Sequence, residues 1–312
     1  MTPRTVSLLT GIVCLVVLAA AITAGCTSGS GETGPVSTAT TMPTPAAVAT
    51  TAPAETTPAA TVATTSTPAP TFSAPHGSLI VFTAASLSGA SKTIGPSFTD
   101  AYPGHPVAFN LDGTQALKTQ VENGAYADVF ISASNSYTNA LQAEGYFVNG
   151  TVKKLTTNYV ILILPASNPA GIRTLADLAR PGVKIAMEAK AVPAGTATLA
   201  VLGNLANSTY SHDWENATLA NVVTYETSEP AVATKVSLGE VDAGFVYQST
   251  YTAAPAGTYA AITIPKKDNY LQTYTIGILK ESTDRNTAAT FEQYMLSVVG
   301  QTILKNYGFT AP

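Results

Sequence analysis

Cysteine is nearly absent from this sequence of 312 residues. Only two occur, Cys14 inside an N-terminal apolar run and Cys26 at the end of that run. The rest of the chain therefore has neither a disulfide framework nor a cysteine-based metal site. Its folded part must be stabilised by its own hydrophobic core.

Charge and histidine are also scarce. Charged residues make up 11% of the chain and the net charge is −4, which gives no reason to expect nucleic acid or an anionic membrane surface as a partner. The three histidines, His76, His105 and His212, do not stand in a motif with a nucleophile. A Gly-x-Ser-x-Gly elbow is missing as well, which argues against an exported hydrolase, the remote alternative.

The N-terminus has the pattern of an export signal. Arg4 precedes a nearly uncharged apolar run that ends in the sequence AITAGC at Cys26. This pattern predicts a lipoprotein signal peptide over residues 1–26, cleaved so that Cys26 carries a lipid anchor. The alternative is an uncleaved anchor helix, because the run is nearly long enough to span a bilayer. In both cases we expect the remaining chain to be exported and tethered to the outer face of the cytoplasmic membrane.

Residues 27–77 differ in composition from the rest of the chain. Threonine, alanine, proline and serine dominate, and large apolar side chains are few. Such a segment buries too little surface to offset the entropy of ordering. We therefore expect a disordered stalk between the membrane and a globular part.

Short apolar runs alternate with helical patterns from about residue 78 onward. We expect strands at 79–83, 107–111, 128–132, 159–164, 184–187, 222–225, 244–247 and 274–279. We expect helices at 87–102, 114–123, 136–144, 194–207, 230–238, 286–299 and 301–307. The strands read as continuous apolar runs, which is typical of strands covered by helices on both faces. The predicted class is α/β with doubly wound sheets.

Several predicted strand-to-helix junctions carry small or hydroxyl-bearing residues. Ser86, Thr114 and Ala194 stand where three helices begin, and Glu229 stands at an N-cap position before Pro230. Each of them alone reads as an ordinary helix cap. Together they place several helix N-termini at the carboxyl edge of the sheet, where open α/β sheets bind ligands. Free N–H groups and the positive ends of helix dipoles would form an anion site there without a cationic side chain.

Six segments, in this order, resemble one known family. They are VFTAASLSGA, ALKTQVENGAYADVFISAS, YVILILPASNPAGIRTLADLARPGVKIAM with the following VPAG, VSLGEVDAGFVYQS, and the ending GQTILKNYGF. In combination they are similar to the substrate-binding component of molybdate ABC transporters, the ModA family. The likeness extends from about Leu79 to Phe309.

The resemblance implies a periplasmic-binding-protein-like fold of type II. Two doubly wound α/β lobes would be joined by two crossover strands, with the ligand cleft between the lobes. Lobe 1 would hold residues 78–157 together with 270–312, and lobe 2 would hold residues 158–269.

The resemblance also implies a set of oxyanion-binding residues. Ser86 and Thr114 match the two hydroxyl ligands of lobe 1, where the family usually has serine at the second place. Ala194 and Glu229 match backbone N–H donors of lobe 2, and Tyr247 matches the phenol that closes the cage. These donors would hold a tetrahedral oxyanion, and no bare metal ion is expected.

Glu229 departs from many bacterial relatives, which have an apolar residue at this position. The related archaeal tungstate/molybdate-binding proteins place a glutamate there as a direct ligand of the metal. They also use an aspartate where this chain has Val192, so only half of that pair is present. The interpretation we favour is that Glu229 offers its main chain, and a role as a direct carboxylate ligand stays open.

The implied function is that of the solute-binding protein of an ABC importer. It would capture molybdate, and tungstate, by N–H and O–H donors and deliver the oxyanion to the membrane permease. The expected protein is a monomer without a cofactor or enzymatic activity. The alternative on the same fold is a receptor for another oxyanion, such as phosphate or sulfate, because the fold alone does not determine the ligand.

Overall fold

The computed structural model of the protein describes residues 77–312. The predicted signal peptide, its Cys26 and nearly all of the predicted stalk lie outside the described residues. Across residues 77–312, none of the helices has both the length and the apolar character needed to cross a bilayer.

Nine strands form one mixed sheet. They are β1 (Leu79–Ala84), β2 (Val107–Asp112), β3 (Val129–Ser132), β4 (Lys153–Pro165), β5 (Ile185–Glu188), β6 (Val222–Glu226), β7 (Ala243–Tyr247), β8 (Tyr259–Thr263) and β9 (Leu271–Ile278). Their order is β2-β1-β3-β9-β4-β7-β5-β6, and β8 pairs with β4.

The helices lie between and around these strands. The α-helices are α1 (Ser88–Ala101), α2 (Thr114–Glu122), α3 (Asn135–Ala143), α4 (Pro193–Ser208), α5 (His212–Ala220), α6 (Glu229–Ser237), α7 (Gln248–Ala253), α8 (Arg285–Leu296) and α9 (Val298–Asn306). Two short 3-10 helices complete the set, η1 (Ala85–Leu87) and η2 (Leu175–Ala179).

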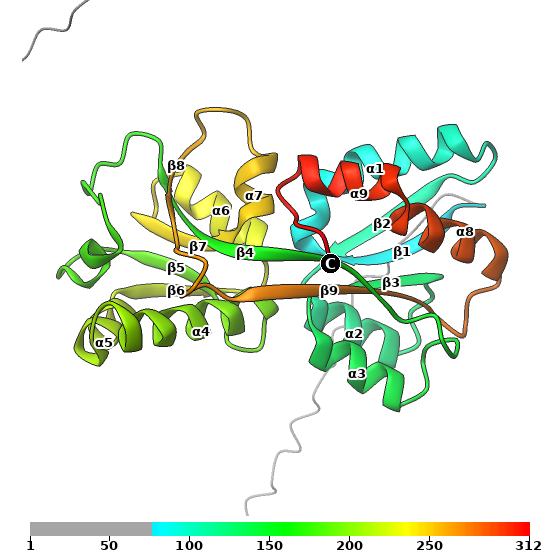
Figure 1. The fold of residues 1–312 in the computed structure, drawn as a ribbon, viewed down its shortest axis with the longest axis horizontal. Coiled ribbons are helices and arrows are strands. Elements are labelled where there is room, and N and C mark those ends of the chain that lie inside the picture. The colour runs from blue at the N-terminus through cyan, green and yellow to red at the C-terminus, as the bar shows by residue number, and fades with distance from the viewer. Residues whose placement is uncertain (1–76) are drawn as a thin grey trace, which may run out of the picture. The chain divides into compact units, whose positions relative to one another are not determined.

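The strands fall into two groups, which are shown in Figure 1. In the first group, β1 runs parallel to both β2 and β3, and in the second group β5 runs parallel to both β6 and β7. Helices α1, α2, α3, α8 and α9 lie with the first group, and α4 to α7 lie with the second. This alternation of parallel strands and helices agrees with the predicted α/β class.

Two long antiparallel strands, β4 and β9, connect the groups. The first half of β4 pairs with β9 from Lys153 to Tyr159, and its second half pairs with β7 and β8. Because β9 also pairs with β3, the two strands belong to both halves of the sheet. They correspond to the two crossover strands expected from the sequence, although the predicted lobe boundaries stay a prediction.

The starts of several helices are fixed by local chemistry. The Ser134 and Ser211 side chains accept hydrogen bonds from the backbone N–H groups of Tyr137 and Trp214 and thereby cap α3 and α5. Proline occupies the first turn of both α4 and α6, where its missing N–H costs no hydrogen bond. Helices α4 and α6 therefore begin at defined residues, and these two helix starts line the candidate site described below.

Candidate functional site

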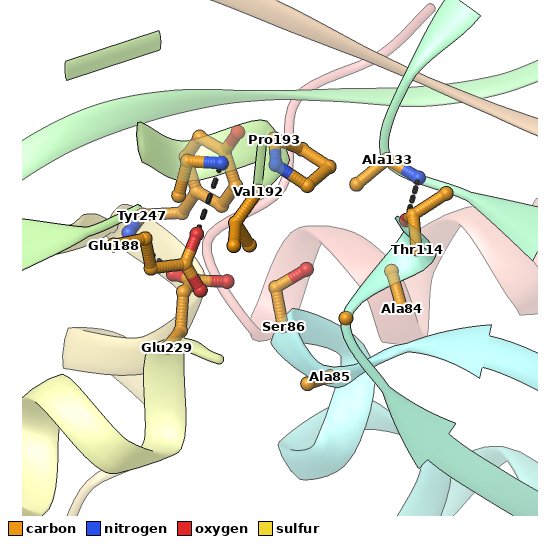
Figure 2. A pocket seen from close by; sticks show the side chains of 12 residues that line it. Ala84, Ala85, Ser86, Thr114, Ala133, Glu188, Val192, Pro193, Glu229 and Tyr247 are labelled. Atoms are coloured by element: carbon orange, nitrogen blue, oxygen red, sulfur yellow. Dashed lines mark hydrogen bonds between the residues drawn. The ribbon is translucent and has the colours of Figure 1, made fainter. Parts of the chain in front are cut away.

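All five residues predicted to bind the ligand line one small cavity. Its volume is about 20 Å³, slightly more than the roughly 10–15 Å³ that one water molecule needs. The cavity therefore suits a compact ligand and excludes, in this closed form, a sugar or a peptide. Figure 2 shows the residues around it.

The cavity has two walls, which belong to the two groups of strands. The first wall consists of Ala84, Ala85, Ser86, Gly113, Thr114 and Ala133. The second wall consists of Glu188, Val192, Pro193, Ala194, Glu229 and Tyr247. Among these twelve residues there is no lysine, arginine or histidine, so the cavity contains no cationic side chain.

On the first wall, Ser86 lies in η1, directly after β1. Its Oγ lies 2.8 Å from the Tyr274 hydroxyl on β9, and its carbonyl oxygen accepts a hydrogen bond from Ser249 Oγ at 3.2 Å. Asn158 in turn donates to Ser249 Oγ at 2.8 Å. These contacts fix both the backbone and the side chain of Ser86. When Tyr274 donates to Ser86 Oγ, the serine O–H can donate in turn to the Glu229 carboxyl group or to a ligand.

Thr114 is the first residue of α2, and its hydroxyl is oriented in a similar way. Thr114 Oγ1 accepts a hydrogen bond from the Ala133 N–H at 3.1 Å (Figure 2). Because the oxygen is used as an acceptor, the hydroxyl proton remains available for an acceptor in the cavity. Ala84, Ala85, Gly113 and Ala133 add little bulk, so a ligand can approach the backbone closely.

On the second wall, the start of α4 lies against the end of β5. The Ala194 N–H donates to Glu188 Oε2 at 3.0 Å. A Cβ atom at Gly195 would lie 2.1 Å from the Ala189 carbonyl oxygen and 2.5 Å from that of Glu188. Only glycine allows this close approach, so Gly195 holds the start of α4 against β5. The predicted N–H donor of Ala194 is thus present, but a carboxyl group of the same chain already accepts from it.

Glu229 lies one residue further into its helix than the sequence suggested. Ser228 is the N-cap of α6, and Glu229 is the first helical residue. Its side chain points into the cavity (Figure 2), where Oε1 accepts hydrogen bonds from the Tyr247 N–H at 2.6 Å and from Thr250 Oγ1 at 3.1 Å. The predicted N-cap position of Glu229 was therefore wrong by one residue. Glu229 presents its carboxyl group to the cavity, which the main-chain interpretation did not include.

Two buried carboxyl groups therefore share this cavity. Glu188 and Glu229 are each 3% exposed. Burial raises the pKa of Glu229 from its ordinary value of 4.5 to about 7, and the Tyr247 N–H and the hydroxyls of Thr250 and Ser86 oppose this rise. Burial and the negative charge of Glu229 raise the pKa of Glu188 well above its ordinary value. Both groups thus hold a proton at higher pH than exposed glutamates do.

Glu188 was missed by the sequence analysis. The strand predicted at 184–187 was ended one residue too early, whereas β5 extends to Glu188. An acidic side chain at the carboxyl end of a buried strand, four residues before Val192, was the available signal. The cavity consequently differs from the cage made only of donors that the resemblance implied.

Tyr247 closes the cavity at the end of β7. Its hydroxyl donates to Gln272 Oε1 at 3.0 Å, and the Gln272 side-chain amide donates to the Ala133 carbonyl oxygen of the first wall. Burial raises the pKa of the Tyr247 phenol well above its ordinary value, so the phenol stays protonated. In this structure the phenol O–H is directed at Gln272 and not at the cavity.

Further hydrogen bonds hold the two walls together around the cavity. The Gln115 side-chain amide at the start of α2 donates to the Thr227 carbonyl oxygen at 3.1 Å. The Tyr137 hydroxyl on α3 donates to the Ala191 carbonyl oxygen. These contacts join the groups on either side of the cavity and account for its small volume.

Two other observations bear on the chemistry of the site. Asp112, an acid near the predicted site, accepts from the Gly113 N–H at 2.7 Å and does not line the cavity, as expected of a turn residue. Within residues 77–312, no three His, Cys, Asp or Glu side chains are grouped so that they could hold a metal ion. The hydroxyls of Ser86 and Thr114 and the N–H group of Ala194 are donors that suit an anion, whereas the two carboxyl groups are acceptors.

Comparison with known proteins agrees with the family expected from the sequence. The family model of bacterial extracellular solute-binding proteins matches residues 79–310. The molybdate-binding protein ModA of Mycobacterium tuberculosis is 34% identical over 235 residues, which cover 75% of this chain and 85% of the relative. The ModA protein of Escherichia coli is 25% identical, covering 76% of this chain and 90% of the relative.

A solved structure gives the same fold. The periplasmic molybdate-binding protein of Azotobacter vinelandii superposes with a TM-score of 0.66 at 22% identity, covering 75% of this chain and 99% of that one. The type II periplasmic-binding-protein fold expected from the sequence is thereby confirmed. The chain is a bacterial extracellular solute-binding protein and belongs to the ModA family.

Proposed function

We propose that this protein captures molybdate, and tungstate, outside the cytoplasm and delivers the oxyanion to the permease of an ABC importer. The observation that carries the proposal is the cavity itself, in which Ser86, Thr114, Ala194, Glu229 and Tyr247 meet. The ModA relatives, whose names state that they bind molybdate, support the choice of ligand.

The mechanism follows from the two walls. Ser86 and Thr114 offer O–H donors from the first wall, and the starts of α4 and α6 bring backbone N–H groups to the second. A tetrahedral anion that contacts both walls stabilises their closed arrangement, because a ligand shifts an equilibrium only through contacts it makes in the favoured state. Closure would then present a joined surface to the permease.

The proposal also covers the oligomeric state of the protein and its attachment to the membrane. The protein acts as a monomeric binding protein without a cofactor and without enzymatic activity. Lipidation of Cys26 tethers it to the outer face of the cytoplasmic membrane, and the segment 27–77 serves as the stalk. The support for the tether is the AITAGC sequence at the end of the apolar run.

Calorimetric titration of the full chain with molybdate, tungstate, sulfate and phosphate tests the proposal. We expect submicromolar binding of molybdate or tungstate, with sulfate and phosphate at least about a hundredfold weaker, which corresponds to about 2.7 kcal/mol. Tighter binding of phosphate or sulfate would replace the proposal by the alternative oxyanion receptor. No binding of any of the four anions would overturn it.

A further inference from the structure

The cavity contains more acceptors than an anion site needs. Glu188 and Glu229 both line it, and both are 3% exposed. Their carboxyl oxygens accept from the Ala194 N–H and the Tyr247 N–H, two donors of the second wall. The protein's own carboxyl groups therefore already accept from two N–H donors of the second wall.

Ionised carboxyl groups in the cavity would repel a bound oxyanion. Molybdate carries two negative charges near neutral pH, and two ionised carboxyl groups would add two more. Like charges repel strongly in a small cavity that is poorly screened by water. Because none of the twelve lining residues is cationic, no side chain of the cavity offsets this charge. The negative charge in the cavity can then be reduced only by protonation of a carboxyl group.

We propose that Glu188 and Glu229 form a proton-binding pair, and that the protein takes up a proton from solvent on this pair when the oxyanion enters. The inference rests on the proposed function. The proton binds a carboxylate oxygen, and the new O–H donates to an oxygen of the anion, while no bond of the anion is broken. A protonated carboxyl group is also a weaker acceptor, which releases the Ala194 N–H or the Tyr247 N–H for the anion.

The groups that face the pair agree with this role. The phenols of Tyr247 on β7 and Tyr274 on β9 lie near both carboxyl groups, and burial raises the pKa of each phenol well above its ordinary value. Both therefore remain neutral donors. The pKa of Glu229, raised to about 7, lies where one proton can be gained or lost at physiological pH.

Three charged side chains near α6 and β6 pair with one another outside the cavity. Lys235 on α6 lies 3.6 Å from Glu226 on β6 and 3.4 Å from Glu240. None of these three lines the cavity. Glu226 is the residue opposite Glu188 in the pairing of β5 with β6, which makes it a matched control for a change of charge just outside the cavity.

The experiment is calorimetric titration of the full chain with sodium molybdate at pH 8, in two buffers of different ionisation enthalpy. The difference between the two heats gives the number of protons taken up. We expect about one proton per anion for the wild type, and an affinity that falls about tenfold per pH unit between pH 7 and 9. For Glu229→Gln we expect the uptake to be largely lost and the pH dependence to flatten. Glu226→Gln should keep the wild-type proton count and slope.

The outcomes are distinct. Tight binding of molybdate by the wild type with the same heat in both buffers, and with no change between pH 7 and 9, would overturn this inference and leave the proposed function intact. Absence of binding by all four anions at pH 6 as well as pH 8 would overturn both. Should Glu229→Gln fail to fold, Glu188→Gln provides the second variant, and the wild-type proton count decides the question by itself.

Discussion

The two walls of the cavity differ in charge and in the state of their donors. The first wall offers the hydroxyls of Ser86 and Thr114 among alanine and glycine, and it carries no ionisable group. The second wall carries two buried carboxyl groups, which accept from its own N–H donors at Ala194 and Tyr247. A proposed anion would therefore compete with carboxyl groups of the protein for the donors of the second wall and for the Ser86 hydroxyl, but not for the Thr114 hydroxyl.

Because of this difference, the two walls should contribute in different ways to the affinity for the anion and to its pH dependence. The Thr114 hydroxyl on the first wall should add binding energy that does not change with pH in the physiological range, because its oxygen accepts from the Ala133 N–H. The carboxyl groups of the second wall make binding depend on their protonation. Changes to each wall should therefore differ in how they alter the affinity and its pH dependence.

Gly195→Ala should have the largest effect, because its Cβ would lie 2.1 Å from a backbone carbonyl oxygen and force the start of α4 away from β5. We expect molybdate affinity to fall by more than about a hundredfold, as the second wall loses its geometry. Gly203→Ala on the same helix is the control, because its Cβ would meet only Glu215 Oε1, at 3.7 Å. Equal affinities of the two variants in calorimetry would contradict the role of Gly195.

The free energy of unfolding should depend on pH because the Glu229 carboxyl group of the second wall is buried. The folded chain binds the Glu229 proton more tightly than the unfolded chain does. The resulting stability is fully present below pH 4.5 and is lost as the pH rises to about 7. This rise in pKa corresponds to about 3 kcal/mol of unfolding free energy. Urea unfolding of the ligand-free chain at pH 5 and pH 8, compared with Glu229→Gln, measures it. A difference between the two chains that does not change with pH would refute the prediction.

Removal of a hydroxyl from the first wall should weaken binding. For Thr114, whose hydroxyl oxygen accepts from the Ala133 N–H, we expect the pH dependence to stay unchanged, whereas loss of the Ser86 hydroxyl also removes a hydrogen bond to Glu229. We expect Ser86→Ala and Thr114→Ala each to weaken molybdate binding by about tenfold to a hundredfold, since a hydrogen bond to a charged group contributes roughly 1.5–3 kcal/mol. Thr114→Ser keeps the hydroxyl and should bind within a few-fold of the wild type. If Thr114→Ser lost as much affinity as Thr114→Ala, the hydroxyl would not be the contributing group.

Tyr274→Phe should have the smallest effect, because Tyr274 does not line the cavity and its main contact with a lining side chain is the hydrogen bond to Ser86 Oγ. Loss of its hydroxyl frees the Ser86 side chain to rotate, and we expect about a threefold to tenfold weaker affinity. Tyr294→Phe is the control, as its hydroxyl donates to Ser97 Oγ outside the cavity. In the Ser86→Ala background, Tyr274→Phe should have no further effect, and an additive loss would argue against a positioning role.

Much of the fold could be predicted from the sequence because the strands are continuous apolar runs next to helical patterns. Strands β1, β2 and β7 begin or end within one residue of the predicted ranges. The apolar pattern did not predict those elements that contain many polar or charged residues. Helix α5 is absent from the predicted helices, although its Trp214 is buried in the core. The first half of β4 was missed because its start, at Lys153 and Lys154, is charged and exposed.

The candidate site was predicted unevenly for the same physical reasons. Ser86 and Thr114 stand at strand-to-helix junctions, and a local signal of this kind is visible in the sequence. The contacts that decide the state of the second wall link residues far apart in the chain, such as Glu229 with Tyr247 and Tyr247 with Gln272. Which group each donor binds depends on tertiary structure. For the same reason, the presence of Glu188 in the cavity was not visible in the sequence.

The most direct test of the central claim is a crystal structure of the chain grown with molybdate, with the molybdenum located by its anomalous scattering. We expect one strong peak in the cavity, with anion oxygens within hydrogen-bond distance of Ser86 Oγ, Thr114 Oγ1 and the Ala194 N–H. We also expect that the Glu188 carboxyl group no longer accepts from Ala194 in the same way. A peak outside the cavity, or an empty cavity at saturating molybdate, would contradict the account.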